Sequence, residues 1–408
     1  MYTCMGIFLV FHPQRNGVTA LKHHIYLDNA ATTPMRKEVL EVMLPYLTEQ
    51  FGNPSSIHAF GREAKRAIER ARKQVAQAIG ATPREIYFTS GGSESDNWAI
   101  QALCHTNAHK GKHIITSTIE HHAILHTCAH MEKNGYEITY IPVDQHGVIS
   151  PESVKNALRK DTVLVTLMAA NNEIGTLQPM EEIGRITKEA GVLFHTDAVQ
   201  AIGSIEVDVQ KWNVDLLSLS AHKFYGPKGV GALYIRKGIA IENLLFGGAQ
   251  ERGLRAGTEN VANIVGLGEA ISLATNDLVV HSETLTRLRE QLINGILSQL
   301  PDVQLNGHPQ KRLPGNVNFS FQRTDGEAVL MRLDLLGIAG ASGSACTSGN
   351  VDPSHVLLAI GLSPELAQGS LRLSLGRFNT QEDIATTITS LVTIVQELRA
   401  MQSPTITA

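Results

Sequence analysis

In Leu217-Ser-Leu-Ser-Ala-His-Lys223-Phe-Tyr-Gly-Pro-Lys228-Gly-Val-Gly, a lysine stands directly behind a short apolar strand, and a turn rich in glycine and proline follows it. A lysine amine becomes a useful nucleophile only where burial or nearby charge lowers its pKa, and Schiff-base lysines lie in such places. A single lysine in such a turn is more often an ordinary surface residue, and that description suits Lys228 better than Lys223. Whether Lys223 is a functional residue must therefore be judged from other signals in the chain.

The run before Lys223 is one of several short apolar runs that alternate with helical patterns from about residue 85 onward. Strands buried on both faces have continuous apolar sequences, so the alternation predicts an α/β fold with a mainly parallel seven-stranded sheet covered by helices. Such sheets bind ligands outside the carboxyl ends of their strands. The expected strands are Glu85–Thr89, His113–Ser117, Tyr136–Ile141, Val163–Met168, Val192–Thr196, Leu216–Leu219 and Gly231–Ile235, with helices such as Glu94–Ala108 and Met180–Ala190 between them.

Beyond residue 260 the pattern changes to two long helices and a smaller α+β part. The expected elements there are helices Val261–Ala274 and Leu285–Leu300, strands near Val317–Phe321 and Leu371–Leu375, and a closing helix near Gln381–Met401. Asn276 and Asp277 mark a hinge. We therefore expect a disordered extension (residues 1–24), a large domain (residues 25–276), whose first residues can pack against the small domain, and a small α+β domain (residues 277–408).

The composition is that of an ordinary globular protein, with 408 residues, 43% of them apolar, and a formal net charge of −4. That balance gives no electrostatic reason to expect direct binding to nucleic acid or to a membrane surface. Four cysteines in so long a chain do not form a disulfide framework. The apolar run Gly6–Phe11 is too short to span a bilayer and poorly built as a signal peptide. We expect a cytoplasmic protein.

Two further signals precede Lys223. Val192-Leu-Phe-His-Thr-Asp197 is a strand that ends in a carboxylate, and Phe88-Thr-Ser-Gly-Gly-Ser93 leads from a strand through a glycine turn into a helix start. Alone, each is more often a simple helix cap or turn. A helix start also cradles phosphate, and a strand-end carboxylate can keep a pyridine nitrogen protonated. With Lys223, the three signals indicate a site for pyridoxal 5'-phosphate (PLP).

Seven motifs of the chain resemble those of cysteine desulfurases of the NifS/IscS type, which belong to the class V branch of fold-type I PLP enzymes. The resemblance runs from about residue 25 to about residue 400, and the Ser-Ala-Cys-Thr-Ser form of the last motif resembles group I. The motifs are Asp28-Asn-Ala-Ala-Thr-Thr-Pro34, Gly52-Asn-Pro-Ser-Ser56, Glu120-His121, Asn171-Asn-Glu-Ile-Gly175, Ser220-Ala-His-Lys223, Glu251-Arg-Gly-Leu-Arg-Ala-Gly-Thr258 and Ser342-Gly-Ser-Ala-Cys346-Thr-Ser.

The resemblance implies roles for matching residues. Lys223 holds the cofactor covalently, Asp197 pairs with the pyridine nitrogen, and His121 stacks on the ring and can move protons. The remaining cofactor contacts are assigned to Gln200 at the phenolic oxygen, to Asn172, to Gly92, Ser93, Ser220 and His222 at the phosphate, and to Thr258, which reaches the phosphate of the other subunit of a homodimer. The substrate carboxylate is assigned to Asn29, Asn172 and Arg372. No metal is expected.

Cys346 lies in a run of small and turn-forming residues, which is typical of a loop. A loop cysteine is the expected place for a thiolate that takes up sulfur, whereas Cys104 and Cys128 lie in helical patterns as core residues. The resemblance therefore implies that L-cysteine is converted to L-alanine while its sulfur stays on Cys346 as a persulfide. An acceptor protein, in iron–sulfur cluster assembly or in tRNA or other thiolation, then receives the sulfur.

Two alternatives stay open from the sequence. Another PLP reaction on the same fold, such as selenocysteine or cystine cleavage or transamination, is separated from desulfuration by replacing Cys346, because direct lysis and transamination need no protein thiol. A non-catalytic scaffold for sulfur transfer has no need of Lys223 and Asp197, and its purified form would lack the yellow colour of bound PLP.

Overall fold

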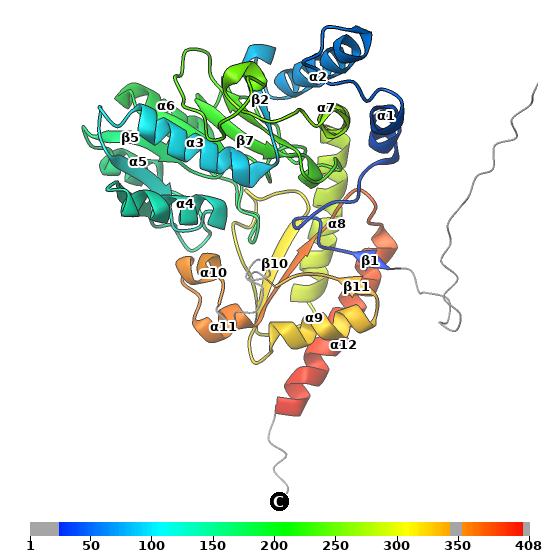
Figure 1. Ribbon diagram of the computed structural model, residues 1–408. Coiled ribbons are helices and arrows are strands. Elements are labelled where there is room, and N and C mark those ends of the chain that lie inside the picture. Colours follow the sequence, from blue (N-terminus) through cyan, green and yellow to red (C-terminus); the bar gives the residue numbers. More distant parts are fainter. Residues whose placement is uncertain (1–23, 343–352, 403–408) are drawn as a thin grey trace, which may run out of the picture.

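The structure is a computed structural model that describes residues 24–342 and 353–402. Within these residues, one sheet is formed by β2 (Ile86–Thr89), β3 (His113–Ser117), β4 (Glu137–Ile141), β5 (Thr162–Thr166), β6 (Leu193–Asp197), β7 (Leu216–Ser220) and β8 (Gly231–Ile235) (Figure 1). Their order across the sheet is β2-β8-β7-β6-β5-β3-β4. Only β8 runs against its neighbours, since every other adjacent pair is parallel. The predicted mainly parallel seven-stranded sheet is confirmed.

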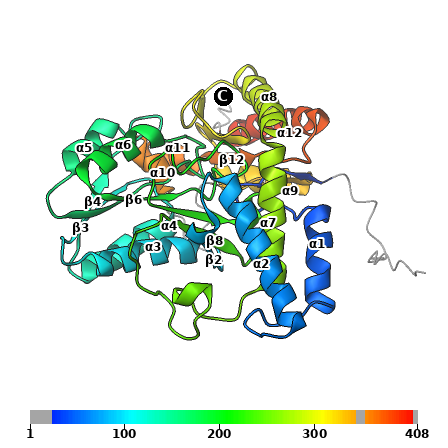
Figure 2. The same cartoon turned by 90° about the horizontal axis from the view of Figure 1, so that it is seen from above.

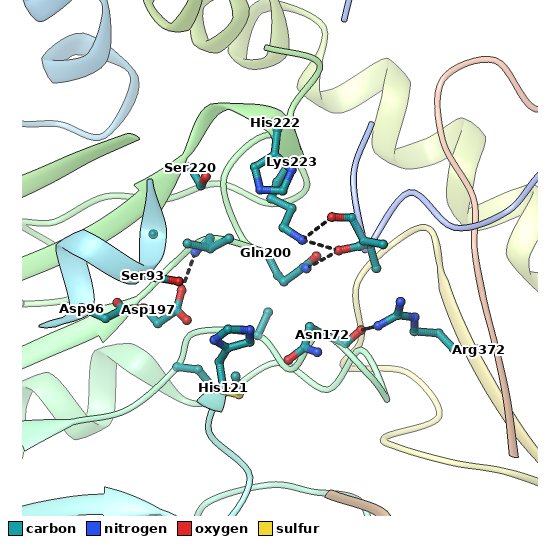
Figure 3. Close-up of a pocket in the computed structure, with 16 residues that line it drawn as sticks. Ser93, Asp96, His121, Asn172, Asp197, Gln200, Ser220, His222, Lys223 and Arg372 are labelled. Atoms are coloured by element: carbon teal, nitrogen blue, oxygen red, sulfur yellow. Dashed lines mark hydrogen bonds between the residues drawn. The ribbon is translucent and has the colours of Figure 1, made fainter. Parts of the chain in front are cut away.

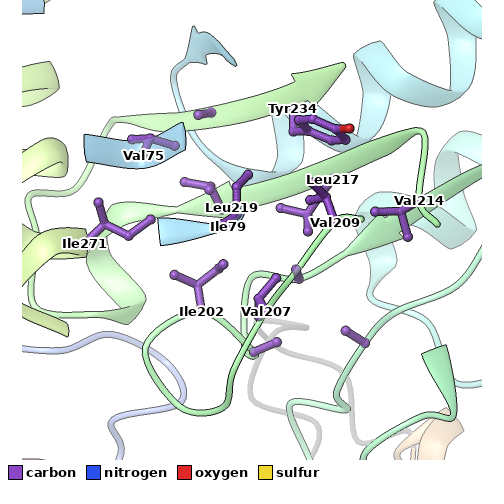
Figure 4. Packing of buried hydrophobic residues seen from close by; sticks show 14 of the residues in the cluster. Val75, Ile79, Ile202, Val207, Val209, Val214, Leu217, Leu219, Tyr234 and Ile271 are labelled. Carbon is purple, nitrogen blue, oxygen red and sulfur yellow. The ribbon is translucent and has the colours of Figure 1, made fainter. Parts of the chain in front are cut away.

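Helices cover both faces of this sheet (Figure 2). Ile114 and Leu216 pack into a buried cluster with residues of α3 (Gly92–Thr106) and α4 (His122–Lys133). The next residue on each strand, Ile115 or Leu217, belongs to the opposite cluster (Figure 4). That cluster includes residues of α2 (Ala59–Ala78), α5 (Pro151–Ala157), α6 (Met180–Ala190) and α7 (Val261–Asn276). Because consecutive side chains point to opposite faces, burial of both faces explains the unbroken apolar runs.

A second, antiparallel sheet lies in the later part of the chain, in the order β12 (Ser370–Ser374), β10 (Asn316–Phe321) and β9 (Val303–Leu305). The short strand β1 (Ile25–Tyr26) pairs in parallel with β11 (Ile338–Ala339), so the start of the described chain lies against this part. Ile25 and Leu27 are buried in its apolar cluster. The helices here are α8 (Leu278–Leu297), α9 (Gly326–Leu335), α10 (His355–Ala359), α11 (Pro364–Gln368) and α12 (Gln381–Gln402).

The junction between α7 and α8 differs from the expected one. Helix α8 begins at Leu278 rather than near residue 285, so Asp277 alone separates the two helices. The Asp277 carboxylate contacts two guanidinium groups, those of Arg36 (2.9 Å) and Arg377. Arg36 directly precedes α1 (Lys37–Thr48), which packs on α7. The division of the chain into domains at residue 276 stays a prediction.

Three further expectations concern the N-terminal segment, the cysteines and membrane-spanning helices. Residues 1–23, with the run Gly6–Phe11, lie outside the described part. Cys104 and Cys128 are buried and unpaired. In the described ranges, no helix is both long and apolar enough to cross a bilayer.

Candidate active site

A cavity of about 290 Å³ lies at the carboxyl ends of the parallel strands (Figure 3). Its walls come from the segments that follow β2, β3, β5, β6 and β7, and from Ala30, Ala31 and Arg372 of the other sheet region. The structure brings together there most of the residues that the sequence indicated: Gly92, Ser93, His121, Asn172, Asp197, Gln200, Ser220, His222, Lys223 and Arg372.

Lys223 ends a single 3-10 turn that follows β7 directly. Its Nζ donates hydrogen bonds to the carbonyl oxygens of Ala30 (2.6 Å) and Ala31 (2.8 Å). The Gln200 side chain donates to the same Ala30 carbonyl at 2.9 Å, so the amine and the amide meet at one point of the cavity wall. Lys228, in the same turn, is exposed, as the sequence indicated.

Asp197 is the last residue of β6 and is buried. Its Oδ1 accepts the backbone N–H of Val199 at 2.9 Å. Burial raises the pKa of Asp197, while His121, the Val199 N–H and Lys223 lower it. His121 stands at the N-cap of α4, where its Nδ1 accepts the Ala123 N–H at 3.1 Å. An accepting Nδ1 leaves the imidazole proton on Nε2.

The helix start at which the sequence predicts a phosphate cradle lies between β2 and α3. Gly91 caps the helix with a φ of 155°, and the first N–H groups of α3 have no partners in the preceding turn. A Cβ on Gly92 would lie 2.8 Å from Val199 Cγ2, so bare backbone faces the cavity there. Ser220 lies across from this turn and His222 follows two residues later; burial, with the charges of Lys223 and Lys228, lowers the pKa of His222 to about 4. His222 is therefore uncharged at neutral pH.

Arg372 projects from β12 and is buried. Its guanidinium donates to the Asp28 carboxylate (2.9 Å) and to the Asn172 carbonyl oxygen (3.2 Å). Its Nε has no hydrogen-bond partner in the described part of the chain. A buried guanidinium with an unused donor beside a cavity suits a carboxylate ligand.

Three predicted residues lie elsewhere. Asn29 lines a smaller adjoining cavity that shares Lys223 and Gln200 with the main one, and its amide donates to the Ser374 carbonyl oxygen at 2.9 Å. Thr258 is exposed and lines a separate cavity near Ser90. Cys346 lies outside the described residues.

The residues of the main cavity fit PLP. The helix start at Gly92 offers N–H groups to a phosphate, Asp197 offers a buried carboxylate to the ring nitrogen, and Lys223 offers an amine to the aldehyde. Within the residues described, no group of three or more side chains is arranged to hold a metal ion.

The sequence interpretation missed one titratable residue of this cavity, Asp96, together with the apolar wall residues Met168, Ala170 and Val199. A signal for Asp96 was present. It follows Gly92 by four positions, and residues at that spacing share one face of a helix.

The chain matches the family model described as aminotransferase class-V over residues 25–386. It is 58% identical over 377 residues to the cysteine desulfurase IscS of Methanosarcina thermophila, which covers 92% of this chain and 93% of that protein. Among solved structures it is similar to a NifS-like protein, with a TM-score of 0.87 and 39% identity over 92% of this chain and all of the other. It is also similar to SspA in complex with cysteine, with a TM-score of 0.78 and 39% identity over 87% of this chain and all of the other. The chain therefore belongs to the class V aminotransferase family, and within it to the cysteine desulfurases.

Proposed function

We propose that this cysteine desulfurase carries out its reaction in the cavity between Lys223 and Asp197, with PLP bound there. The class V family depends on this cofactor, which, when bound, withdraws the electron pair that is freed at the α-carbon of an amino acid. The observation that carries the proposal is the pair of adjacent strand ends, β6 and β7, that direct a buried carboxylate and an amine into one cavity.

In this proposal the cavity walls orient the cofactor. The carboxylate of Asp197 would hold a proton at the ring nitrogen, the imidazole of His121 would lie against the ring, and Gln200 would donate to the phenolic oxygen. The backbone of Gly92 and the hydroxyl groups of Ser93 and Ser220 receive the phosphate. His222 joins them as a neutral donor, because burial keeps it uncharged. Asn172 contacts the cofactor from the loop after β5.

The substrate carboxylate binds Arg372, with Asn172 and Asn29 beside it. Arg372 is held ready by Asp28, and its Nε remains available to the ligand. The Lys223 amine then takes the α-proton of the substrate. L-Cysteine is the substrate we assign, and the solved structure of the similar protein SspA contains cysteine.

Cys346 accepts the sulfur in our proposal, which rests on the sequence alone for this residue. Its thiolate attacks the substrate sulfur, so that an S–S bond forms while the C–S bond breaks. The electron pair of the broken bond stays with the substrate carbon, which takes up a proton and leaves as part of alanine. Cys346 is left as a persulfide, whose outer sulfur passes to an acceptor protein of iron–sulfur cluster assembly or of thiolation.

We further propose a cytoplasmic homodimer. Three apolar side chains are exposed where α1 leads into α2: Phe51 (73%) and Ile57 (91%) in the connection, and Phe60 (57%) at the start of α2. The rings of Phe51 and Phe60 stack, with centroids 5.7 Å apart. Apolar side chains gathered in this way favour a covered face. In the dimer, Thr258 would contact the phosphate bound by the partner. Thr258 is exposed and does not line the active-site cavity of its own chain, which is consistent with this role.

The test compares two lysines of one turn. Lys223→Ala should abolish alanine release from L-cysteine, by about two to four orders of magnitude or more, because proton transfer relies on this amine. Lys228→Ala removes an exposed amine of the same turn and should leave the rate unchanged. Multiple turnover by Lys223→Ala at the rate of the control would contradict the proposal.

A further inference from the structure

Asp96 is a second carboxyl group in the wall of the active-site cavity. It lies on the second turn of α3, which packs on β6 and β7, and only 1% of its surface is exposed (Figure 3). Its Oδ1 has no hydrogen-bond partner in the described part of the chain. An aspartate five residues into a helix is past the positions where it would cap free N–H groups, so helix capping does not explain it.

In residues 24–342 and 353–402, no lysine or arginine forms an ion pair with Asp96. A basic side chain that does lie close is that of His195 on β6, whose Nε2 is 3.7 Å from Asp96 Oδ1. Burial lowers the pKa of His195 to about 3, so this ring is uncharged at neutral pH. Its two nitrogens contact the hydroxyl groups of Thr166 (2.8 Å) and Ser218 (3.0 Å) instead. The pair of Asp96 and His195 is therefore not an ion pair.

Two other carboxyl groups act on Asp96, those of Asp197 on β6 and Glu120 in the segment before α4. Burial is the largest cause that raises the pKa of Asp96 well above its usual range, and the neighbouring carboxyl groups of Asp197 and Glu120 raise it further. Only the Ser218 hydroxyl opposes them. Glu120 is fully buried as well; its Oε1 accepts hydrogen bonds from Ser117 and Met168, and burial raises its pKa to about 8.

Asp197 differs from Asp96 in the groups that favour its charge. It accepts the Val199 N–H, and both His121 and Lys223 lower its pKa. Two neighbouring carboxyl groups in a buried site do not both ionise without compensation, and the proton goes to the one whose charge is supported less. In this pair that residue is Asp96.

We propose that Asp96 is a positioning residue that holds a proton at neutral pH, so that the pair of Asp96 and Asp197 carries one negative charge and that charge resides on Asp197. The inference rests on the proposed role of Asp197 as partner of the PLP ring nitrogen. A neutral Asp96 leaves the ring nitrogen facing a single carboxylate, and it fills the space behind that carboxylate with a polar group that adds no charge of its own.

Infrared spectroscopy of the cofactor-free, full-length protein locates the proton. Labelling with ¹³C-aspartate shifts the aspartate carboxyl signals away from those of Glu120 and of the other glutamates. At pH 7 the wild-type protein should show a protonated aspartate signal that is absent from Asp96→Asn. A signal that persists in Asp96→Asn would overturn the proposal, as would its absence from the wild type. If Asp96→Asn does not fold, the wild-type spectrum alone still contradicts the proposal when it shows no protonated aspartate.

A second measurement uses PLP itself, added to the cofactor-free proteins. An amide is as neutral as a protonated carboxyl group, so Asp96→Asn should bind PLP within about threefold of the wild-type Kd and show the wild-type absorption spectrum of the bound cofactor. A tenfold or greater loss of affinity in a folded Asp96→Asn protein would mean that a negative charge on Asp96 takes part, and would contradict the inference. Failure of the wild type to bind PLP would instead contradict the proposed function, whatever the infrared result.

Discussion

His195 links three strands next to the active site, and replacing it tests whether its imidazole is buried in the uncharged form. The imidazole on β6 bridges Thr166 of β5 and Ser218 of β7, and Ser218 pairs with Asp197 in the sheet register. His195→Gln keeps a neutral side chain with a donor and an acceptor, but it removes the only group of this cluster that can gain a positive charge. The variant therefore separates the cost of burying a charge from the loss of hydrogen bonds.

The size of the effect follows from the pKa of His195. Burial lowers it to about 3 from an ordinary value of 6.5, so the unfolded chain binds a proton between pH 6.5 and pH 3 that the folded chain does not bind. Stability contributed by this residue is thus complete above pH 6.5 and falls as the pH is lowered through that window. The loss amounts to about 2 kcal/mol at pH 5 and about 4 kcal/mol at pH 3.

Urea unfolding of the wild type and of His195→Gln at pH 7 and pH 5, at one protein concentration, measures this difference. At pH 7 the variant should be less stable by about 1–2 kcal/mol, because its hydrogen bonds to the two hydroxyl groups are poorer. At pH 5 the difference in the free energy of unfolding should narrow or close, because only the wild type has a histidine that is protonated on unfolding and is thereby destabilised. An unchanged gap at the two pH values would refute the conclusion that His195 is buried as a neutral ring.

Three further variants test the assigned roles. Asp197→Asn keeps the shape of the side chain but not its charge, so PLP should stay bound while alanine formation slows by about tenfold or more; an unchanged rate would show that another group protonates the ring nitrogen. Arg372→Lys loses paired hydrogen bonds worth about 1.5–3 kcal/mol, so the KM for L-cysteine should rise by about tenfold or more while PLP affinity stays, and an unchanged KM would move the carboxylate site elsewhere. Cys346→Ser cannot carry a persulfide, so alanine release should stop although substrate still changes the cofactor spectrum; release of alanine and sulfide at the wild-type rate would instead indicate a β-lyase.

The sheet could be predicted from the sequence because both of its faces are buried, and each expected strand lies within two residues of the observed one. The start of α8 could not be predicted from the sequence. Val279 and Val280 expose 68% and 71% of their surface at its first turn, so the amphipathic period there is obscured. Helix α2 carries a usable signal in the sequence, since its buried residues Ala64, Ala67 and Ala71 follow the helical period.

The site shows a similar division. Lys223 and Asp197 stand directly behind apolar strands, and strand ends of a parallel sheet meet at one edge, so sequence order was sufficient to predict that they lie together. Asp96 follows no strand, and an acidic residue inside a helix is normally solvated, so its spacing of four from Gly92 is a weak signal and its burial on the inner side of α3 is what places it in the cavity. The role of Thr258 depends on a second copy of the chain, and neither the sequence nor a single chain tests it.

The most direct measurement of the central claim identifies the amine that PLP engages. The full-length protein is incubated with PLP, treated with borohydride to fix the carbonyl carbon onto the amine that holds it, digested, and examined by mass spectrometry. The account predicts the pyridoxyl adduct on the peptide that contains Lys223, in Lys228→Ala as in the wild type, and none in Lys223→Ala. An adduct on Lys228, or one that survives in Lys223→Ala at the wild-type level, would contradict it.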